Sequence, residues 1–240
     1  FRQENQMKIL AIEASSLVAS VAIINDDVIT AEYTINNKIT HSETLLPMID
    51  EICRMTDTDV RTFDAIAISG GPGSFTGLRI GSATAKGLAL ALDIPIVHVP
   101  TLNAMAYNVY GTDMVICPIM DARRGQVYTG IYSFEGDELK VYLENSALPI
   151  EDLIDKLKSI GRKTIFLGDG VPVFKAQIDD IYSVEHCYAP AGMNRQRASS
   201  VAVLGSVLFE QGVTINSDEH VPEYLRVSQA ERERAEKMGQ

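Results

Sequence analysis

The order of the predicted elements occurs twice along the chain, and this repetition constrains the fold more than any other feature. In the first half, short runs rich in Val, Ile and Ala are separated by tight breaks, which indicates strands joined by hairpins at residues 8–12, 19–24 and 28–34. A helix is then predicted from Thr40, with Glu43 at the spacing of a capping box.

The remainder of the first half alternates strands with helices. A buried-type strand at 65–69 leads into a glycine-rich turn and a helix over 76–92. A strand at 95–100 then leads into a helix over 101–110. Strands that alternate with helices favour parallel pairing, because the helix supplies the crossover that parallel strands need.

The second half repeats this order, with an Arg-Arg-Gly turn between its first two strands. Its strands are predicted at 114–122, 126–134, near 139–143, 164–168 and 183–186, and its helices at 149–159, 171–178 and 198–211. Antiparallel hairpins followed by parallel crossovers give a mixed sheet with helices on its faces. We therefore predict an α/β protein with two similar half-domains, at residues 7–110 and 111–226.

A duplicated unit of this kind resembles the actin-like ATPase superfamily (ASKHA, ribonuclease H-like), which includes sugar kinases and Hsp70 ATPase domains. Residues 1–6 precede Met7 and are expected to be an upstream scar that lies outside the fold. Residues 227–240 are polar with mixed charges and are expected to be a frayed helix or a disordered tail.

The charge distribution argues against a protein that binds nucleic acid alone. The formal net charge is −11, with −5 in residues 1–110 and −6 in residues 111–240. Nucleic-acid-binding proteins normally carry a basic footprint, because phosphate neutralisation dominates their affinity. The longest basic features are Arg123-Arg124 and a loose set between residues 156 and 163. Any connection to RNA is therefore expected to be indirect.

The cysteines and the apolar runs indicate a cytoplasmic protein. The three cysteines are odd in number and form no CxxC pair, which argues against a disulfide framework and fits a reducing cytoplasm. No apolar run approaches the roughly 20 residues that a membrane helix requires, and no signal peptide is recognised.

The most informative segment is SGGPGSFTGLRIG, from Ser69 to Gly81. A glycine-rich turn at a helix N-terminus offers free N–H groups to an anion. However, the segment lacks the GxxxxGK[ST] of a phosphate loop and misses the dinucleotide pattern GxGxxG by one residue. It also lacks the glycines that flank the serine of a nucleophile elbow. Ser74 and Thr76 are therefore expected to cap the following helix.

The helix over 76–92 is apolar nearly all round yet contains several glycines. Each glycine costs about 1 kcal/mol relative to alanine, so close packing must offset the loss. Gly77, Gly81 and Thr84 lie on one face at helical spacing. This face is expected to admit a second helix, which is either the helix over 42–56 of the same chain or one from another subunit.

The glycine-rich segment resembles the signature of the TsaB family, also called YeaZ. Further similarities follow in the family's order: KILAIEAS (8–15), HSETLLPMI (41–49), MDARRGQVY (120–128), LGDG (167–170) and PEYLR (222–226). The resemblance spans almost all of residues 7–226, and the glycine-rich segment and DARRGQVY are specific in combination.

The resemblance implies an actin-like fold that has lost its own catalysis and has no metal or cofactor of its own. Such proteins pair with TsaD, a paralogue that transfers the threonylcarbamoyl group to the adenosine beside the anticodon of tRNA, and the ATPase TsaE joins them. Without TsaD they form homodimers through the same surface. The interface residues that the resemblance implies are His41, Leu45, Ile49, Ser74, Phe75, Thr76, Gly77, Arg79, Ile80, Gly81, Ala83 and Thr84.

Several residues agree with lost catalysis. TsaD holds a metal with an HxxxH helix, and here Leu45 stands where a second histidine would follow His41. ATP-binding relatives carry an aspartate and a glycine-containing turn after the first strand, whereas this chain has Glu13-Ala14-Ser15-Ser16.

Other residues leave a second function open. Asp121 and Asp169 lie near strand ends, where they either hold a metal or cap turns. Arg123 and Arg124, at a hairpin tip, either contact a partner or tRNA phosphate or are simply solvated. An ATPase or small-molecule kinase of the same superfamily is the alternative function.

Overall fold

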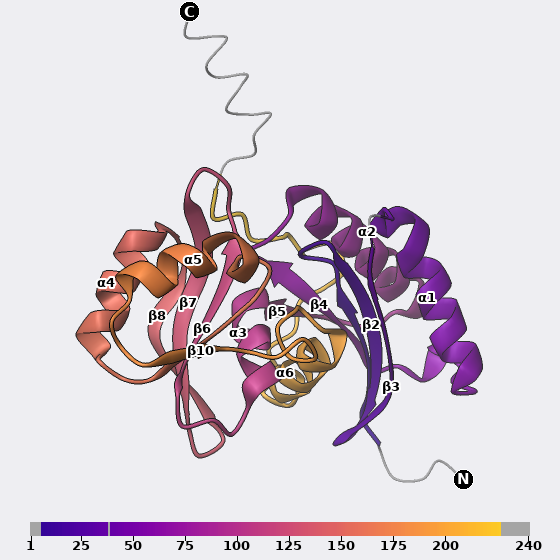
Figure 1. Cartoon of the computed structure of the whole chain (residues 1–240). Helices are drawn as coiled ribbons and strands as arrows, with labels where there is room; N and C mark the ends of the chain where they lie inside the picture. Colours follow the sequence, from indigo (N-terminus) through magenta and orange to yellow (C-terminus); the bar gives the residue numbers. More distant parts are fainter. Residues whose placement is uncertain (1–5, 38, 227–240) are drawn as a thin grey trace, which may run out of the picture.

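Two mixed five-stranded sheets form the framework of the protein (Figure 1). The computed structural model describes residues 6–37 and 39–226, so the expectations for residues 1–5 and 227–240 lie outside the described part. The first sheet has the order β3-β2-β1-β4-β5 and contains β1 (Lys8–Glu13), β2 (Val18–Asn25), β3 (Val28–Asn36), β4 (Ala65–Gly71) and β5 (Ile96–Pro100). The second has the order β10-β9-β6-β7-β8 and contains β6 (Val115–Asp121), β7 (Gln126–Glu135), β8 (Glu138–Pro149), β9 (Thr164–Leu167) and β10 (His186–Tyr188).

The two sheets have the same topology, which confirms the predicted duplicated α/β fold. In each, the first strand pairs antiparallel with the next strand along the chain and parallel with the strand that follows the first long helix. The helices are α1 (His41–Met55), α2 (Phe75–Leu92), α3 (Thr101–Ala106), α4 (Ile150–Ile160), α5 (Val171–Ile181) and α6 (Ala198–Glu210). Short 3-10 helices occupy Val60–Thr62 and Tyr107–Val109.

The helices and sheets form layers that bury both faces of each sheet (Figure 1). Helices α1 and α2 cover the outer face of the first sheet, and α4 and α5 cover the outer face of the second. Helices α3 and α6 lie between the sheets. Strand β1 shows why: Leu10 and Ile12 point to α1 and α2, whereas Ile9 and Ala11 point to α6.

Helix α6 corrects one detail of the predicted division. The sequence order places it in the half-domain at 111–226, but it packs on the first sheet, where Val201 and Ala202 meet Ile9 and Ala11. Its N-terminus is held there by long-range contacts, because Ser20 Oγ accepts the N–H of Ala198 at 3.1 Å. Within the described residues, no helix is long and apolar enough to span a bilayer.

Other differences from the predicted elements have local causes. Strand β8 is longer than predicted. It is an edge strand with many exposed positions, so its apolar alternation is too weak to reveal its full length in the sequence. Strand β10 begins later than expected because His186 Nδ1 bonds the carbonyl oxygen of Val184 at 2.8 Å in a local turn. The predicted capping box does not form: Thr40 is the N-cap of α1, but its side chain makes no cap hydrogen bond.

Candidate partner-binding surface and cleft

The turn between β4 and α2 contains glycines because other parts of the chain approach its backbone closely. Gly71 has φ +123°, and a Cβ there would lie 2.4 Å from the carbonyl oxygen of Glu223. A Cβ on Gly73 would lie 2.3 Å from the carbonyl oxygen of Ser15. Ser74 then caps α2, because its side chain accepts the N–H of Gly77 at 3.3 Å. This confirms the expected capping role of Ser74, whereas Thr76 lies inside α2 and is not its cap.

The glycine face of α2 packs against its own chain. A Cβ on Gly77 would lie 2.1 Å from the carbonyl oxygen of Ala14 and 3.1 Å from the ring of His41 in α1. A Cβ on Gly81 would lie 3.0 Å from Ala14 Cβ and 3.2 Å from Ile68 Cδ1. The helix that approaches this face is therefore α1 of the same chain, which resolves the alternatives left by the sequence.

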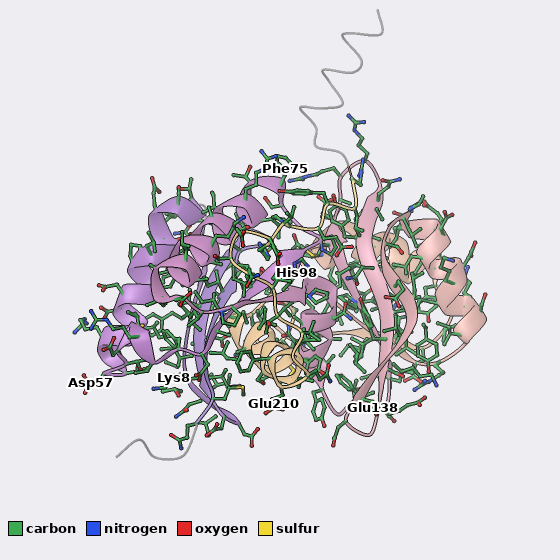
Figure 2. All side chains as sticks on the ribbon, turned by 180° about the vertical axis from the view of Figure 1, so that it is seen from behind. Lys8, Asp57, Phe75, His98, Glu138 and Glu210 are labelled. Atoms are coloured by element: carbon green, nitrogen blue, oxygen red, sulfur yellow. The ribbon has the colours of Figure 1, made fainter. Side chains whose placement is uncertain are left out.

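A segment at residues 218–226, here called the strap, covers a second flank of α2. Tyr224 stacks on Phe75 with ring centroids 4.8 Å apart, and Arg79 lies over the other side of Phe75, 3.8 Å from its centroid. Farther along the helix, His220 Nδ1 and Ser82 Oγ are 2.8 Å apart. Seen from behind, the strap passes His98 and Phe75 before it reaches the β6–β7 turn (Figure 2).

Helix α2 is thus enclosed on three sides and open on the fourth. The sheet, α1 and the strap cover three sides, and the open stripe carries Thr76, Ala83, Gly87 and Leu90, which is 75% exposed. A Cβ on Gly87 would meet nothing within 4 Å. The stripe is therefore a shallow surface of small residues with an exposed leucine at its end.

The structure divides the predicted interface residues into three groups. The exposed ones are Ser74, Thr76, Arg79 and Ala83, and the half-buried ones are Phe75, Ile80 and Thr84. The remaining ones, His41, Leu45, Ile49, Gly77 and Gly81, are buried in their own chain. For this last group the structure corrects the expectation of direct contact with a partner. These residues lie beneath the surface, where they hold α1 and α2 together. The interface itself stays a prediction.

Sequence reasoning missed apolar residues on the exposed side of α1. Leu46, which is 54% exposed, and Pro47 lie outside the buried stripe of Leu45, Ile49 and Ile52. An apolar residue outside the apolar stripe of a helix was the signal that could have identified Leu46.

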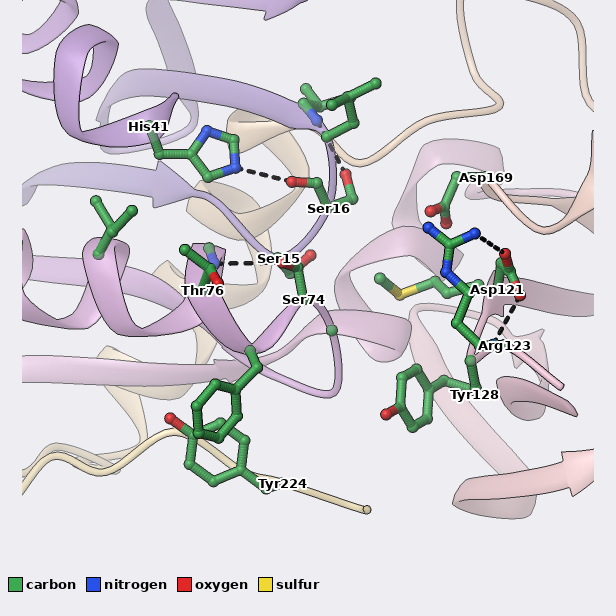
Figure 3. A pocket seen from close by; sticks show the side chains of 18 of the residues that line it. Ser15, Ser16, His41, Ser74, Thr76, Asp121, Arg123, Tyr128, Asp169 and Tyr224 are labelled. Atoms are coloured by element: carbon green, nitrogen blue, oxygen red, sulfur yellow. Dashed lines mark hydrogen bonds and ion pairs between the residues drawn. The ribbon is translucent and has the colours of Figure 1, made fainter. Parts of the chain in front are cut away.

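A cleft of about 1030 Å³ opens between the two sheets (Figure 3). One wall comes from the first half of the chain, through Ser15, Ser16 and the N-terminus of α2. The other comes from the β6–β7 turn, Asp169 and the strap. The predicted site residues Asp121, Asp169, Arg123 and Arg124 all line it.

Glu13 lies buried beneath this cleft and is bonded to its own loop. Its Oε1 accepts the N–H of Ser15 at 2.6 Å, and burial raises its pKa to about 7 despite hydrogen bonds from Ser15 and Ser69. The carboxyl group therefore stabilises the β1–β2 turn. The described residues contain no group of three or more His, Cys, Asp or Glu side chains that could hold a metal ion.

Asp121 supports the turn that follows it. Its Oδ1 accepts the N–H of Arg123 at 2.8 Å, and its Oδ2 pairs with the guanidinium of Arg123 at 3.1 Å (Figure 3). The turn-capping interpretation therefore describes Asp121. Asp169 accepts a bond from Gln196 Nε2 at 3.3 Å, and burial raises its pKa above the ordinary value.

Comparison with known proteins identifies relatives along nearly the whole chain. Residues 29–234 match the family described as TsaD: tRNA N6-adenosine threonylcarbamoyltransferase. The chain is 36% identical over 227 residues to the tRNA threonylcarbamoyladenosine biosynthesis protein TsaB of Bacillus subtilis, covering 94% of this chain and 96% of that protein. It is 29% identical to the protein of the same name from Escherichia coli, covering 92% and 95%.

Solved structures agree on the fold. A Pseudomonas aeruginosa protein described as similar to peptidase YEAZ superimposes with a TM-score of 0.80 at 24% identity, covering 92% of this chain and 100% of that one. A second structure, YeaZ from Pseudomonas aeruginosa, gives a TM-score of 0.77 at 24% identity, covering 91% and 100%.

Proposed function

The chain belongs to the TsaB family within the broader TsaD family, and on that premise we propose that it is a non-catalytic subunit in the synthesis of threonylcarbamoyladenosine in tRNA. In this proposal it acts in the cytoplasm as a scaffold and activator of a TsaD-type transferase, and a TsaE-type ATPase joins the complex. In the absence of the transferase it forms a homodimer through the same surface. Its relatives' shared name, tRNA threonylcarbamoyladenosine biosynthesis protein, supports the pathway.

The open side of α2 is the observation that carries the proposal. Thr76, Ala83 and Gly87 present almost no side-chain bulk, so a partner helix could approach the α2 backbone closely. Leu46 and Leu90 add exposed apolar side chains from α1 and α2. Small residues flanked by exposed leucines suit helix packing against a folded partner, because they let backbones approach and apolar area be buried.

The contacts of two carboxylates at the cleft support the proposal that the chain is a non-catalytic subunit. Glu13 stands at the end of the first strand, where ATP-binding relatives carry an aspartate, and it is bonded to the backbone of its own turn. Asp121 is bonded to the backbone and side chain of Arg123. Both carboxylates therefore have structural partners in place of a nucleotide-bound metal.

The proposal is tested by reconstitution. Tagged protein is mixed with the TsaD-type and TsaE-type proteins of the same organism, with and without ATP, and the captured proteins are analysed. Formation of threonylcarbamoyladenosine in a tRNA transcript is measured in parallel. We expect capture of the TsaD-type protein and modification that depends on this chain. Full modification in its absence, or no capture, would contradict the proposal.

The volume of the cleft is the observation that favours the alternative function. About 1030 Å³ would accommodate a nucleotide, as an ATPase or small-molecule kinase requires. Calorimetry of the isolated chain with ATP and Mg²⁺, together with a phosphate-release assay, separates the two functions. We expect no turnover, and turnover that survives further purification would favour the ATPase.

A further inference from the structure

The β6–β7 turn holds two arginines in a backbone conformation that their side chains disfavour. Arg123 has φ 65° and Arg124 has φ 57°, and Gly125 follows with φ 72°. Residues with a Cβ rarely adopt this left-handed region, and hairpin turns that need it normally use Asn-Gly or Asp-Gly. Strained backbone of this kind persists where its surroundings impose it, and it concentrates at functional sites.

Contacts from two directions hold this turn in its left-handed backbone conformation. Asp121 bonds both the N–H and the guanidinium of Arg123, at 2.8 and 3.1 Å. From the strap, Arg226 Nη1 donates to the carbonyl oxygens of Ala122 and Arg123, at 2.5 and 3.4 Å. The strap therefore fixes the orientation of the turn at the mouth of the cleft.

The arginine side chains of the turn are exposed at the rim of the cleft. The side chain of Arg123 is 85% exposed. Arg124 is exposed too, and among residues 6–37 and 39–226 it has no hydrogen-bond or ion-pair partner. An arginine kept on a strained turn without a partner in the described part of the chain is well placed to bind a ligand.

The neighbouring charges at this mouth include several guanidinium groups. Arg195 and Arg226 line the same cleft, and Arg79 lies beside it against Phe75 and Tyr224. Three acidic side chains also line the cleft: Asp121 is paired with Arg123, and Asp169 and Glu223 are half-buried. Several arginines therefore gather with aromatic rings at the rim of this cleft, on a chain whose net charge is −11.

We propose that Arg123 and Arg124 contact the phosphate backbone of RNA directly, at the mouth of the cleft. Guanidinium groups bind phosphate oxygens in a bidentate manner, and arginine and aromatic side chains stack on unpaired bases. This inference rests on the proposed function, because that function brings RNA to the complex, and it replaces the indirect connection expected from net charge.

The test measures RNA affinity of the assembled complex with the TsaD-type partner. The probe is a fluorescent, unmodified tRNA transcript with an adenosine beside its anticodon, titrated at several salt concentrations. The double variant Arg123→Ala/Arg124→Ala is compared with Lys156→Ala/Lys158→Ala, which removes the same charge from exposed positions on α4. Size-exclusion chromatography of each sample reports assembly with the partner.

We expect the arginine variant to assemble normally and to bind RNA about tenfold more weakly. The slope of the logarithm of the binding constant against the logarithm of the salt concentration should become shallower by about 2, one unit for each lost phosphate contact. The lysine variant should bind like the wild type. Unchanged affinity and slope in the arginine variant would overturn the inference, as would a complex that binds no RNA. Loss of assembly instead of RNA binding would also overturn it and would assign the arginines to the protein interface. Failure of the wild-type chain to assemble would contradict the proposed function itself.

Discussion

The N–H of Glu223 donates a hydrogen bond of 2.7 Å to the carbonyl oxygen of Gly70, which fastens the strap to the glycine-rich turn. The two residues lie far apart along the chain, yet Gly71 next in sequence has space for no side chain because of this contact. The glycine-rich turn is thus a docking point for the strap as well as the beginning of α2.

Gly71→Ala should therefore destabilise the protein. The added Cβ would lie 2.4 Å from the Glu223 carbonyl oxygen, at a φ of +123° that alanine rarely adopts. We expect the free energy of unfolding in urea to fall by about 3 kcal/mol. Gly192→Ala is the control, because its Cβ would meet nothing within 4 Å and its φ is ordinary. Equal stability of the two variants would show that the strap moves to make room for the added methyl group without loss of stability.

Arg124→Gly should stabilise the protein. Glycine adopts the φ of 57° without strain, so we expect the free energy of unfolding to rise by about 1 kcal/mol. Arg124→Ala removes the same charge but retains the strain, and it should not stabilise. If both variants changed stability equally, the charge of Arg124 and not its backbone would be responsible.

The sequence predicts the layers of this protein better than it predicts its contacts across them. Apolar spacing identified α2 and its glycine face, but the partner of Gly77 is the backbone of Ala14, which no local pattern reveals. The buried positions of Leu45 and Ile49 follow from helical spacing, so their assignment to an interface could have been questioned from the sequence. The strap has no periodicity, and its route along Ser82 and Phe75 depends on tertiary contacts alone.

Glu13 should make stability depend on pH. Burial raises its folded pKa from 4.5 to about 7, so the folded state binds the proton more tightly than the unfolded chain. Stability from this group is therefore present below pH 4.5 and is lost as the pH rises towards 7, by about 1.4 kcal/mol per pH unit. Glu13→Gln cannot ionise, so its stability relative to the wild type should increase between pH 5 and pH 7 in urea unfolding. A difference that stays constant over this range would contradict the burial of the carboxyl group.

Glu32 should be needed to anchor α6. Its Oε1 accepts the N–H of Ser199 at 2.9 Å and its Oε2 pairs with Arg197 at 2.5 Å. Burial alone would raise the pKa of Glu32, but these bonds hold it below the ordinary value, so this stabilisation is present at neutral pH and lost in acid. We expect Glu32→Ala to lower the free energy of unfolding by about 2 kcal/mol at pH 7. Glu51→Ala, which breaks an exposed pair with Arg54, should have little effect on the free energy of unfolding. A similar loss in both variants would contradict the role of Glu32 in anchoring α6.

The open face of α2 is tested most directly by the dissociation constant of the chain and its TsaD-type partner, measured for Ala83→Glu. Ala176→Glu is the matched control, because Ala176 is an exposed alanine on α5, on the outer face of the second sheet. A glutamate buried at the interface without a partner costs about 2 kcal/mol or more, so Ala83→Glu should weaken binding at least about 30-fold while Ala176→Glu binds like the wild type. Wild-type affinity in Ala83→Glu would show that the partner binds elsewhere.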